Sequence, residues 1–153
     1  MNKREKAEAL FLEGYNCAQA VVGAYAQEIG MDFDTAVRLV SPFGGGMGRL
    51  REVCGTVSGM FFVAGAIFGY DDPKDSAAKK ELYERIQFLA ERFQEETGSI
   101  VCRELLGAAG KDTSPVPEER TKAYYQKRPC VKMVGLAAEI MEKYITEITS
   151  PVS

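Results

Sequence analysis

Four cysteines are the side chains of this sequence that are best suited to chemistry, and they stand at positions 17, 54, 102 and 130. The 153 residues include no histidine, which excludes Ser-His-Asp and Cys-His catalysis, histidine-ligated zinc and histidine-ligated haem. General acid–base work would fall to Glu, Asp, Lys, Tyr or Cys. The chemistry to consider is therefore that of thiols, as metal ligands or as redox groups. The alternative is that they are plain core residues, because free cysteine is often buried as a small apolar side chain.

The spacing of the cysteines matches no standard metal or redox motif. The sequence has no CxxC pair, no ferredoxin run and no thioredoxin motif. Their position relative to helix-start signals is more informative, because each cysteine falls at or near a predicted helix N-terminus. In chain order, Cys17 follows Asn16, a good N-cap; Cys54 follows a glycine-rich segment; Cys102 follows Gly98-Ser99; and Cys130 follows Pro129.

If these four helix starts converge, they form a positive pocket. Orphan N–H groups and helix dipoles at such a point favour thiolates or an anionic cluster. Hydrogen bonds from these N–H groups to the sulfurs would raise the reduction potential of an iron–sulfur centre. For Cys54 in particular, the same effect predicts a low thiol pKa.

The glycine-rich segment Gly44-Gly45-Gly46-Met47-Gly48 predicts a loop, because glycine disfavours a helix interior and tolerates positive φ. It lacks the GK[ST] of a P-loop, and no strand precedes it as a dinucleotide-binding fingerprint requires. A tight turn against a neighbouring helix is the favoured role. Arg49, and Arg103 beside Cys102, are positioned to steady an anion, whereas Arg51 is interpreted as a surface charge. The residues predicted to contact a cofactor are Gly45, Gly46, Gly48 and Arg49.

The remaining sequence predicts helices with no strand-like alternation. We expect an all-α single domain over residues 1–153, a bundle of about six helices around a buried helix from about Val53 to Tyr70. The other expected helices cover residues 2–14, 17–29, 35–40, 74–97, 100–107 and 130–148, with a long loop over 108–127 that is helical at most around 118–125.

Composition narrows the class of partner and the compartment. The net charge of −3 gives no sign of the basic surface that binds the phosphates of nucleic acid. The longest apolar run, near residues 57–70, is too short and glycine-rich to insert in a membrane. The N-terminus has no signal-peptide core, which predicts a cytoplasmic protein, where structural disulfides are uncommon. An apolar helical surface allows a homodimer, a common assembly.

Four motifs in order resemble the C_GCAxxG_C_C family, a group of small bacterial and archaeal proteins described as redox-active. They are GYNCAQAV around Cys17, FGGGMGR followed by EVCGTVSG around Cys54, SIVCRELLG around Cys102, and a lone Cys130 before the last helix. The resemblance runs from about Gly14 to Tyr144. One departure is Thr56, which stands where the family's CGAxxG core has alanine.

The resemblance implies that the four cysteines form the functional site, as ligands of a cluster or as redox thiols. Members look like partners of oxidoreductases and transporters, so a redox partner of that kind is expected. Haem does not carry over, since this sequence has neither CxxCH nor histidine. The resemblance names no reaction, and whether the chain is an enzyme stays open.

Three hypotheses follow, in order of preference. In the first, Cys17, Cys54, Cys102 and Cys130 bind an iron–sulfur cluster for electron transfer or redox sensing, with structural zinc on the same four residues as the alternative. In the second, Cys54 is a reactive thiol of a thiol–disulfide protein and another cysteine resolves it. In the third, the chain is a non-catalytic helical binding module with its cysteines in the core.

Overall fold

The computed structural model describes residues 1–149, and in them the chain is all-α. The expected fold class is confirmed, with two short helices, at residues 44–47 and 122–127, in addition to the seven helices expected. Nine α-helices are present in this range: α1 (Lys3–Leu12), α2 (Cys17–Ala24), α3 (Phe33–Leu39), α4 (Gly44–Met47), α5 (Gly55–Phe68), α6 (Ser76–Thr97), α7 (Cys102–Leu106), α8 (Lys122–Lys127) and α9 (Cys130–Thr149). Two 3₁₀ turns, η1 (Ser41–Phe43) and η2 (Gly107–Lys111), lie between them.

Local signals in the sequence account for most helix ends. Asn16 forms a capping box with Gln19 at the start of α2, and the Asp75 side chain accepts the Ala78 N–H at the start of α6. Gly98, with φ of +90°, ends α6 in the left-handed conformation. The second helix is shorter than predicted, since α2 stops at Ala24 and turns continue to Gly30.

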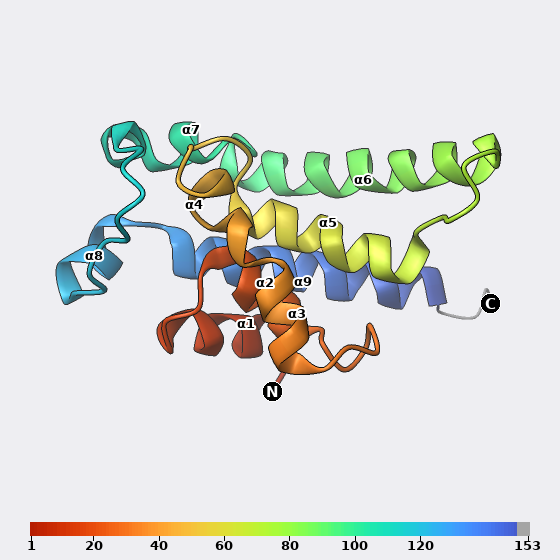
Figure 1. The fold of residues 1–153 in the computed structure, drawn as a ribbon, viewed down its shortest axis with the longest axis horizontal. Helices are drawn as coiled ribbons and strands as arrows, with labels where there is room; N and C mark the ends of the chain where they lie inside the picture. The colour runs from red at the N-terminus through yellow and green to blue at the C-terminus, as the bar shows by residue number, and fades with distance from the viewer. Residues whose placement is uncertain (150–153) are drawn as a thin grey trace.

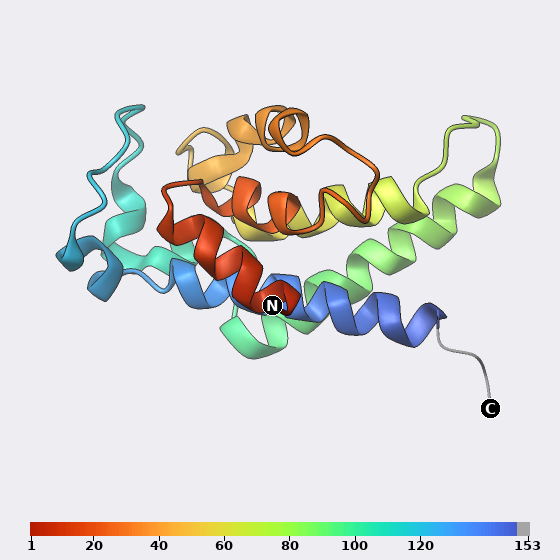
Figure 2. The same ribbon diagram turned by 90° about the horizontal axis from the view of Figure 1, so that it is seen from below.

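The core lies where α5 packs against α2, α6 and α9, and where α1 packs across α9 and α2. Figure 1 shows α5 between α6 and α9, and Figure 2 shows α1 crossing α9. The expected central helix is thus present, but its burial is uneven. Every residue from Gly55 to Met60 is buried, whereas Ile67 near its other end is exposed.

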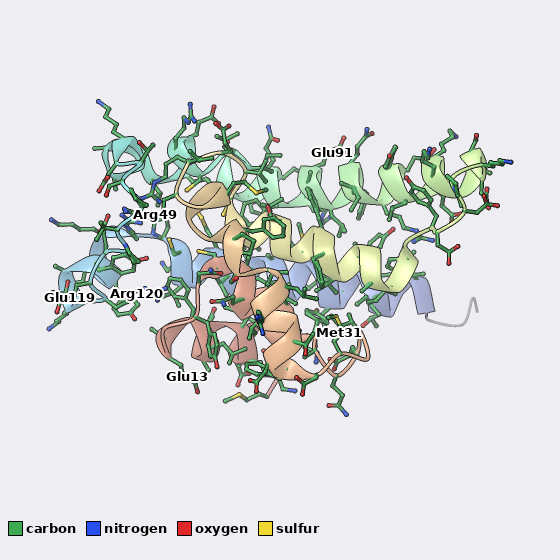
Figure 3. The ribbon with its side chains drawn as sticks, viewed as in Figure 1. Glu13, Met31, Arg49, Glu91, Glu119 and Arg120 are labelled. Atoms are coloured by element: carbon green, nitrogen blue, oxygen red, sulfur yellow. The ribbon has the colours of Figure 1, made fainter. Side chains whose placement is uncertain are left out.

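The short elements gather at one end of the molecule. Helices α4, α7 and α8 lie there, at the opposite end from the start of α6 and the end of α9 (Figure 1). Arg49 and Arg120 lie at the same end, whereas Glu91 stands on the outer side of α6 (Figure 3). None of the helices within residues 1–149 has the length and apolarity needed to cross a bilayer.

Candidate functional site

All four cysteines begin helices, as the sequence predicts. Cys17, Cys102 and Cys130 are the first residues of α2, α7 and α9, and Cys54 is the N-cap of α5. The chain holds them as free thiols, three buried and Cys17 half-buried. Four separate helix N-termini therefore each supply one thiol, near backbone N–H groups that lack helical partners.

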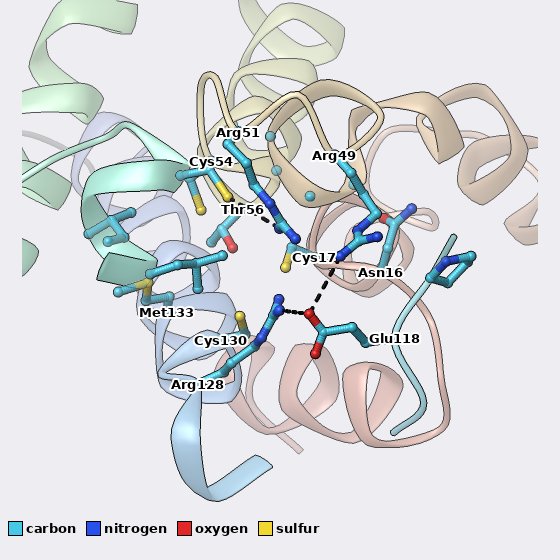
Figure 4. A pocket seen from close by; sticks show the side chains of 18 of the residues that line it. Asn16, Cys17, Arg49, Arg51, Cys54, Thr56, Glu118, Arg128, Cys130 and Met133 are labelled. Carbon is cyan, nitrogen blue, oxygen red and sulfur yellow. Dashed lines mark hydrogen bonds and ion pairs between the residues drawn. The ribbon is translucent and has the colours of Figure 1, made fainter. Parts of the chain in front are cut away.

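The four cysteines line the same cavity, of about 320 Å³ (Figure 4). The residues predicted to contact a cofactor line it as well: Gly45, Gly46, Gly48 and Arg49. The structure thus brings together both predicted sets of site residues. It adds residues that sequence reasoning missed, namely Thr56, Glu118, Arg120, Tyr124 and Arg128.

The glycine-rich segment is a tight turn whose backbone is left-handed at Gly45 and Gly46, although the short helix α4 spans it. A Cβ on Gly46 would stand 2.6 Å from the Cβ of Cys102 and 2.8 Å from the Glu52 nitrogen. Only glycine permits so close an approach at φ of +75°. The predicted tight turn against a neighbour is confirmed, and the neighbour is the start of α7.

A short antiparallel contact fixes Cys54 beside Cys102. The Cys54 N–H donates to the Ile100 carbonyl at 2.8 Å, and the Cys102 N–H donates to the Glu52 carbonyl at 2.6 Å. An isolated β-bridge joins Val53 and Val101 between these bonds. The two thiols are therefore held by backbone pairing, which does not depend on a ligand.

Cys17 and Cys130 form a second pair, from α2 and α9. Donation of the Cys17 S–H to the Cys130 sulfur raises the pKa of Cys17 well above its ordinary value, and burial raises it further. The same hydrogen bond lowers the pKa of Cys130, with support from the Arg128 charge. Cys130 is thus the thiol at this site that forms a thiolate most readily.

The low pKa expected for Cys54 is wrong. Burial, followed by the charge of Cys17, raises the pKa of Cys54 to about 12. The Thr56 hydroxyl opposes this rise, but the N-cap position does not overcome the loss of water. Without a positively charged ligand, Cys54 is therefore a poor nucleophile.

Arg51 is buried and faces the thiols, so its interpretation as a surface charge is also wrong. Its side chain is about 1 % exposed. Its Nε donates to the Asp112 carbonyl at 2.9 Å and its Nη1 to the Cys102 sulfur at 3.9 Å. Backbone φ of +64° at this residue turns the side chain inward, and no sequence pattern announces such a conformation. Burial raises the pKa of Cys102, and Arg51 opposes that rise.

A segment without regular structure, residues 112–121, forms part of the cavity wall, and we call it the strap. Arg49 donates to the carbonyls of Ser114, at 2.5 Å, and Val116, and forms ion pairs at 3.4 Å with Asp112 and Glu118. Pro115 and Pro117 of the strap line the cavity. Arg49 therefore holds the strap on the glycine turn.

The end of the strap is tied to α1 and to the start of α9. Arg120 donates to the carbonyls of Phe11 and Tyr15 at 2.9 and 3.0 Å and lies 4.1 Å over the Phe11 ring. Arg128 pairs with Glu118 (Figure 4). The signal in the sequence that could have found these residues is the length of the loop, since long loops without helix or strand are usually functional.

The four thiols do not converge on a point that suits a single ion. Among the described residues, no group of three or more His, Cys, Asp or Glu side chains could hold a metal ion. The four thiols line the cavity together with Arg49, Arg51, Arg120 and Arg128.

The comparisons with known proteins agree with this architecture. A family model described as "Putative redox-active protein (C_GCAxxG_C_C)" matches residues 15–144, which include all four cysteines and the strap. No curated protein and no solved structure matches the chain. Because the matched region covers most of the sequence, the chain belongs to the C_GCAxxG_C_C family of redox-active proteins.

Proposed function

We propose that Cys17, Cys54, Cys102 and Cys130 hold an iron–sulfur cluster, and that the protein serves electron transfer or redox sensing in the cytoplasm. The observation that carries the proposal is that four free cysteines, each at the start of a different helix, line one cavity together with a buried arginine. This arrangement provides four sulfur ligands and a positive environment for their charge.

The donor set has the composition that an iron–sulfur cluster requires. Four thiolates satisfy a [2Fe–2S] or a [4Fe–4S] centre, and a chain without histidine cannot supply a Rieske centre. In a cluster the four thiolates would bind two or more iron atoms, so their sulfurs would stand farther apart than around a single ion. A zinc site would bring the same four sulfurs to about 2.3 Å from one ion, so metal analysis separates the two.

The buried charge gives an independent test of fit. Arg51 forms no ion pair among the described residues, and one of its Nη atoms has no hydrogen-bond partner. A buried cation without a counter-charge is unfavourable. A cluster with four thiolate ligands carries net negative charge, and the raised pKa of Cys54 would fall on binding positive iron.

The chain's own residues would hold the cluster and exclude water. The cluster supplies one-electron oxidation and reduction. The helix starts orient the four sulfurs, the backbone pairing beside Val53 and Val101 holds two of them together, and the strap forms part of the cavity wall. A redox partner, such as an oxidoreductase or a transporter-associated protein, would exchange the electron at this end of the molecule.

The test is anaerobic purification followed by an absorbance spectrum and by iron, sulfide and zinc analysis, on wild type and on Cys54→Ser. We expect broad visible absorption with stoichiometric iron and sulfide in the wild type, both lost in the variant while its helical circular dichroism is kept. Zinc in a protein without visible absorption would show that the four cysteines hold a structural metal and not a cluster. Protein with neither metal, before and after reconstitution with iron and sulfide, would contradict the proposal.

The contact between Cys17 and Cys130 favours a thiol–disulfide protein as the second candidate. The Cys130 thiolate would attack an external disulfide and expel one thiolate. Cys17 would then attack the mixed disulfide and release the second, so that two electrons pass from the protein to the external disulfide. In this role Cys130 takes the place that the sequence suggested for Cys54.

Peptide mapping of metal-free protein after treatment with oxidised glutathione tests this candidate. It predicts a Cys17–Cys130 disulfide that dithiothreitol reverses, and no disulfide in Cys130→Ser. Four thiols that stay reduced would exclude it.

A further inference from the structure

Two polar groups in the wall of the cavity have no nitrogen or oxygen atom as a hydrogen-bond partner. They are Nη2 of Arg51 and the hydroxyl of Thr56, and both side chains are buried, Arg51 at about 1 % and Thr56 at 0 % exposure. Buried polar groups in proteins almost always have a partner, so each exception indicates an unseen ligand or a special role. Both residues line the same cavity as the four thiols.

A third buried polar group also has no hydrogen-bond partner, but it lies outside the cavity. The hydroxyl of Ser58 is unpartnered as well, and it lies on the same helix, α5, half a turn from Thr56. Ser58 is not among the residues that line the cavity. It therefore serves as an internal reference for a buried hydroxyl that the cavity contents do not reach.

One acceptor of Arg51 is a sulfur atom of the site. Its Nη1 already points to the Cys102 sulfur at 3.9 Å, and its Nε is engaged by the Asp112 carbonyl. This leaves Nη2 as an available donor in a cavity that presents four thiols. A guanidinium prefers an anionic acceptor, because charge-assisted hydrogen bonds are the stronger ones.

Thr56 stands between two of the thiols. In Figure 4 its side chain lies beside those of Cys17 and Cys54, and its hydroxyl favours the charged form of both. Residue 56 is in the first turn of α5, directly after the glycine that follows Cys54. The hydroxyl is therefore positioned to donate to sulfur on the α5 side of the cavity, opposite the strap.

We propose that Arg51 and Thr56 donate hydrogen bonds to the sulfur atoms of the bound cluster and thereby raise its reduction potential. This inference rests on the proposed function. Donors to cluster sulfurs, and positive charge nearby, stabilise the reduced form because it carries the additional negative charge. The two residues act as positioning and tuning residues, and the four cysteines remain the ligands.

The experiment is a redox titration of the reconstituted protein, followed by the visible spectrum, on wild type and five variants. Thr56→Val keeps the shape and removes the hydroxyl, and Thr56→Ser restores it. Arg51→Met removes charge and donors, and Arg51→Lys keeps the charge with a different donor geometry. Ser58→Ala is the matched control.

We expect Thr56→Val to lower the equilibrium constant for reduction about tenfold, which is about 59 mV for a one-electron couple. Arg51→Met lowers it further, Arg51→Lys lies between that variant and the wild type, and Thr56→Ser and Ser58→Ala match the wild type. If Arg51→Met does not fold, Arg51→Lys and Thr56→Val carry the test.

The two proposals fail in different ways. A wild-type protein that takes up no iron and sulfide overturns the proposed function, and this inference with it. A wild type that holds a cluster whose potential is unchanged in Thr56→Val and Arg51→Lys overturns this inference alone. An equal shift in Ser58→Ala also overturns it, because the effect would then be general to buried hydroxyls of α5.

Discussion

Two regions of the molecule differ in whether their buried polar groups have hydrogen-bond partners. One is the junction of α1, α2 and α9. The other is the cavity end, formed by α4, α7, α8 and the strap. In the junction, buried polar atoms have partners: the Tyr25 hydroxyl donates to the Ala138 carbonyl at 2.8 Å, and Lys3 donates to the Ala24 carbonyl at 3.1 Å and pairs with Glu28. In the wall of the cavity, by contrast, Nη2 of Arg51 has no partner, and the Thr56 hydroxyl has only the sulfurs of Cys17 and Cys54 beside it.

Backbone conformation separates the same two regions. The junction consists of regular helices, whereas the glycine turn and its continuation place Met47, Arg49 and Arg51 at positive φ. Such conformations cost about 1–3 kcal/mol each and persist only where the surrounding structure enforces them. The junction therefore stabilises the fold, whereas the cavity end contains the strained backbone and unsatisfied donors that form the site.

The largest loss of stability should come from the junction side of the core. Met141 on α9 is fully buried and does not line the cavity. Met141→Ala should lower the free energy of unfolding by about 2–5 kcal/mol, because it removes buried apolar surface and leaves a cavity. Denaturant unfolding measures this, and iron uptake by the folded fraction should equal that of the wild type. Loss of uptake in folded Met141→Ala protein would break the proposed separation of stability from site.

A smaller loss of stability with a larger effect on the site is expected for Gly46→Ala. The new Cβ would clash with Cys102 and with the backbone of Arg51 and Glu52, and alanine is strained at this φ, so about 2–3 kcal/mol should be lost. Gly30→Ala is the control, since φ is also positive, at +69°, but no atom lies within 4 Å of the new Cβ and the residue is outside the cavity. It should cost about 1–2 kcal/mol.

Iron content of the two reconstituted variants then separates strain from geometry. Gly46→Ala should lose bound iron because Cys102 is displaced, and Gly30→Ala should keep it. Equal iron content in both would show that the close approach of Gly46 to Cys102 is not needed by the site.

Loss of the Arg49 side chain should loosen the strap, with little change in the free energy of unfolding of the whole protein. Arg49→Met removes two carbonyl contacts and two ion pairs, which should cost about 1–2 kcal/mol and let the strap open more often. In metal-free protein, the thiols should react with an aromatic disulfide reagent roughly tenfold faster, the factor for about 1.4 kcal/mol in the opening equilibrium.

Arg103→Met is the matched control for Arg49. Arg103 also pairs with a carboxylate, Glu52, but it is half-exposed and makes no contact with the strap. Its loss should leave the rate of thiol modification unchanged. Equal acceleration by the two variants would mean that the strap is not what limits access.

The smallest effect is expected on the exposed face of α6, outside both regions. Lys80 and Glu84 form an i,i+4 ion pair at 2.8 Å with both side chains largely exposed. Lys80→Ala should change the free energy of unfolding by less than about 0.5 kcal/mol and leave iron content unaltered. A larger change, measured by thermal unfolding at low and high salt, would mean that α6 is more than a cover for the core.

Local signals carried the sequence predictions that the structure confirms. Asn16 and Gly98 determine helix ends through bonds within a few residues, so they can be read without a fold. The positions of the cysteines at helix starts follow from the same signals. The all-α class follows from the absence of strand-like alternation.

The parts that could not be predicted depend on distant contacts or on backbone conformation. Arg51 is buried because the turn before it is left-handed and because Asp112 on the strap accepts its hydrogen bond. The sequence predicts an acidic Cys54, but the burial of this thiol depends on how α5 packs in the core. The contact between Cys17 and Cys130 joins two helices from opposite parts of the sequence, and no spacing rule relates them.

The start of α9 at Cys130 has a consequence for how such a protein matures in the cell. On the proposed function, three ligands leave the ribosome well before the fourth, so the cluster can be completed only when most of the chain has been synthesised. Insertion then links four helices that are far apart in sequence, and binding free energy adds to folding free energy. Chains that fail to load would unfold more often and be degraded first, so iron supply itself would set how much of the protein accumulates.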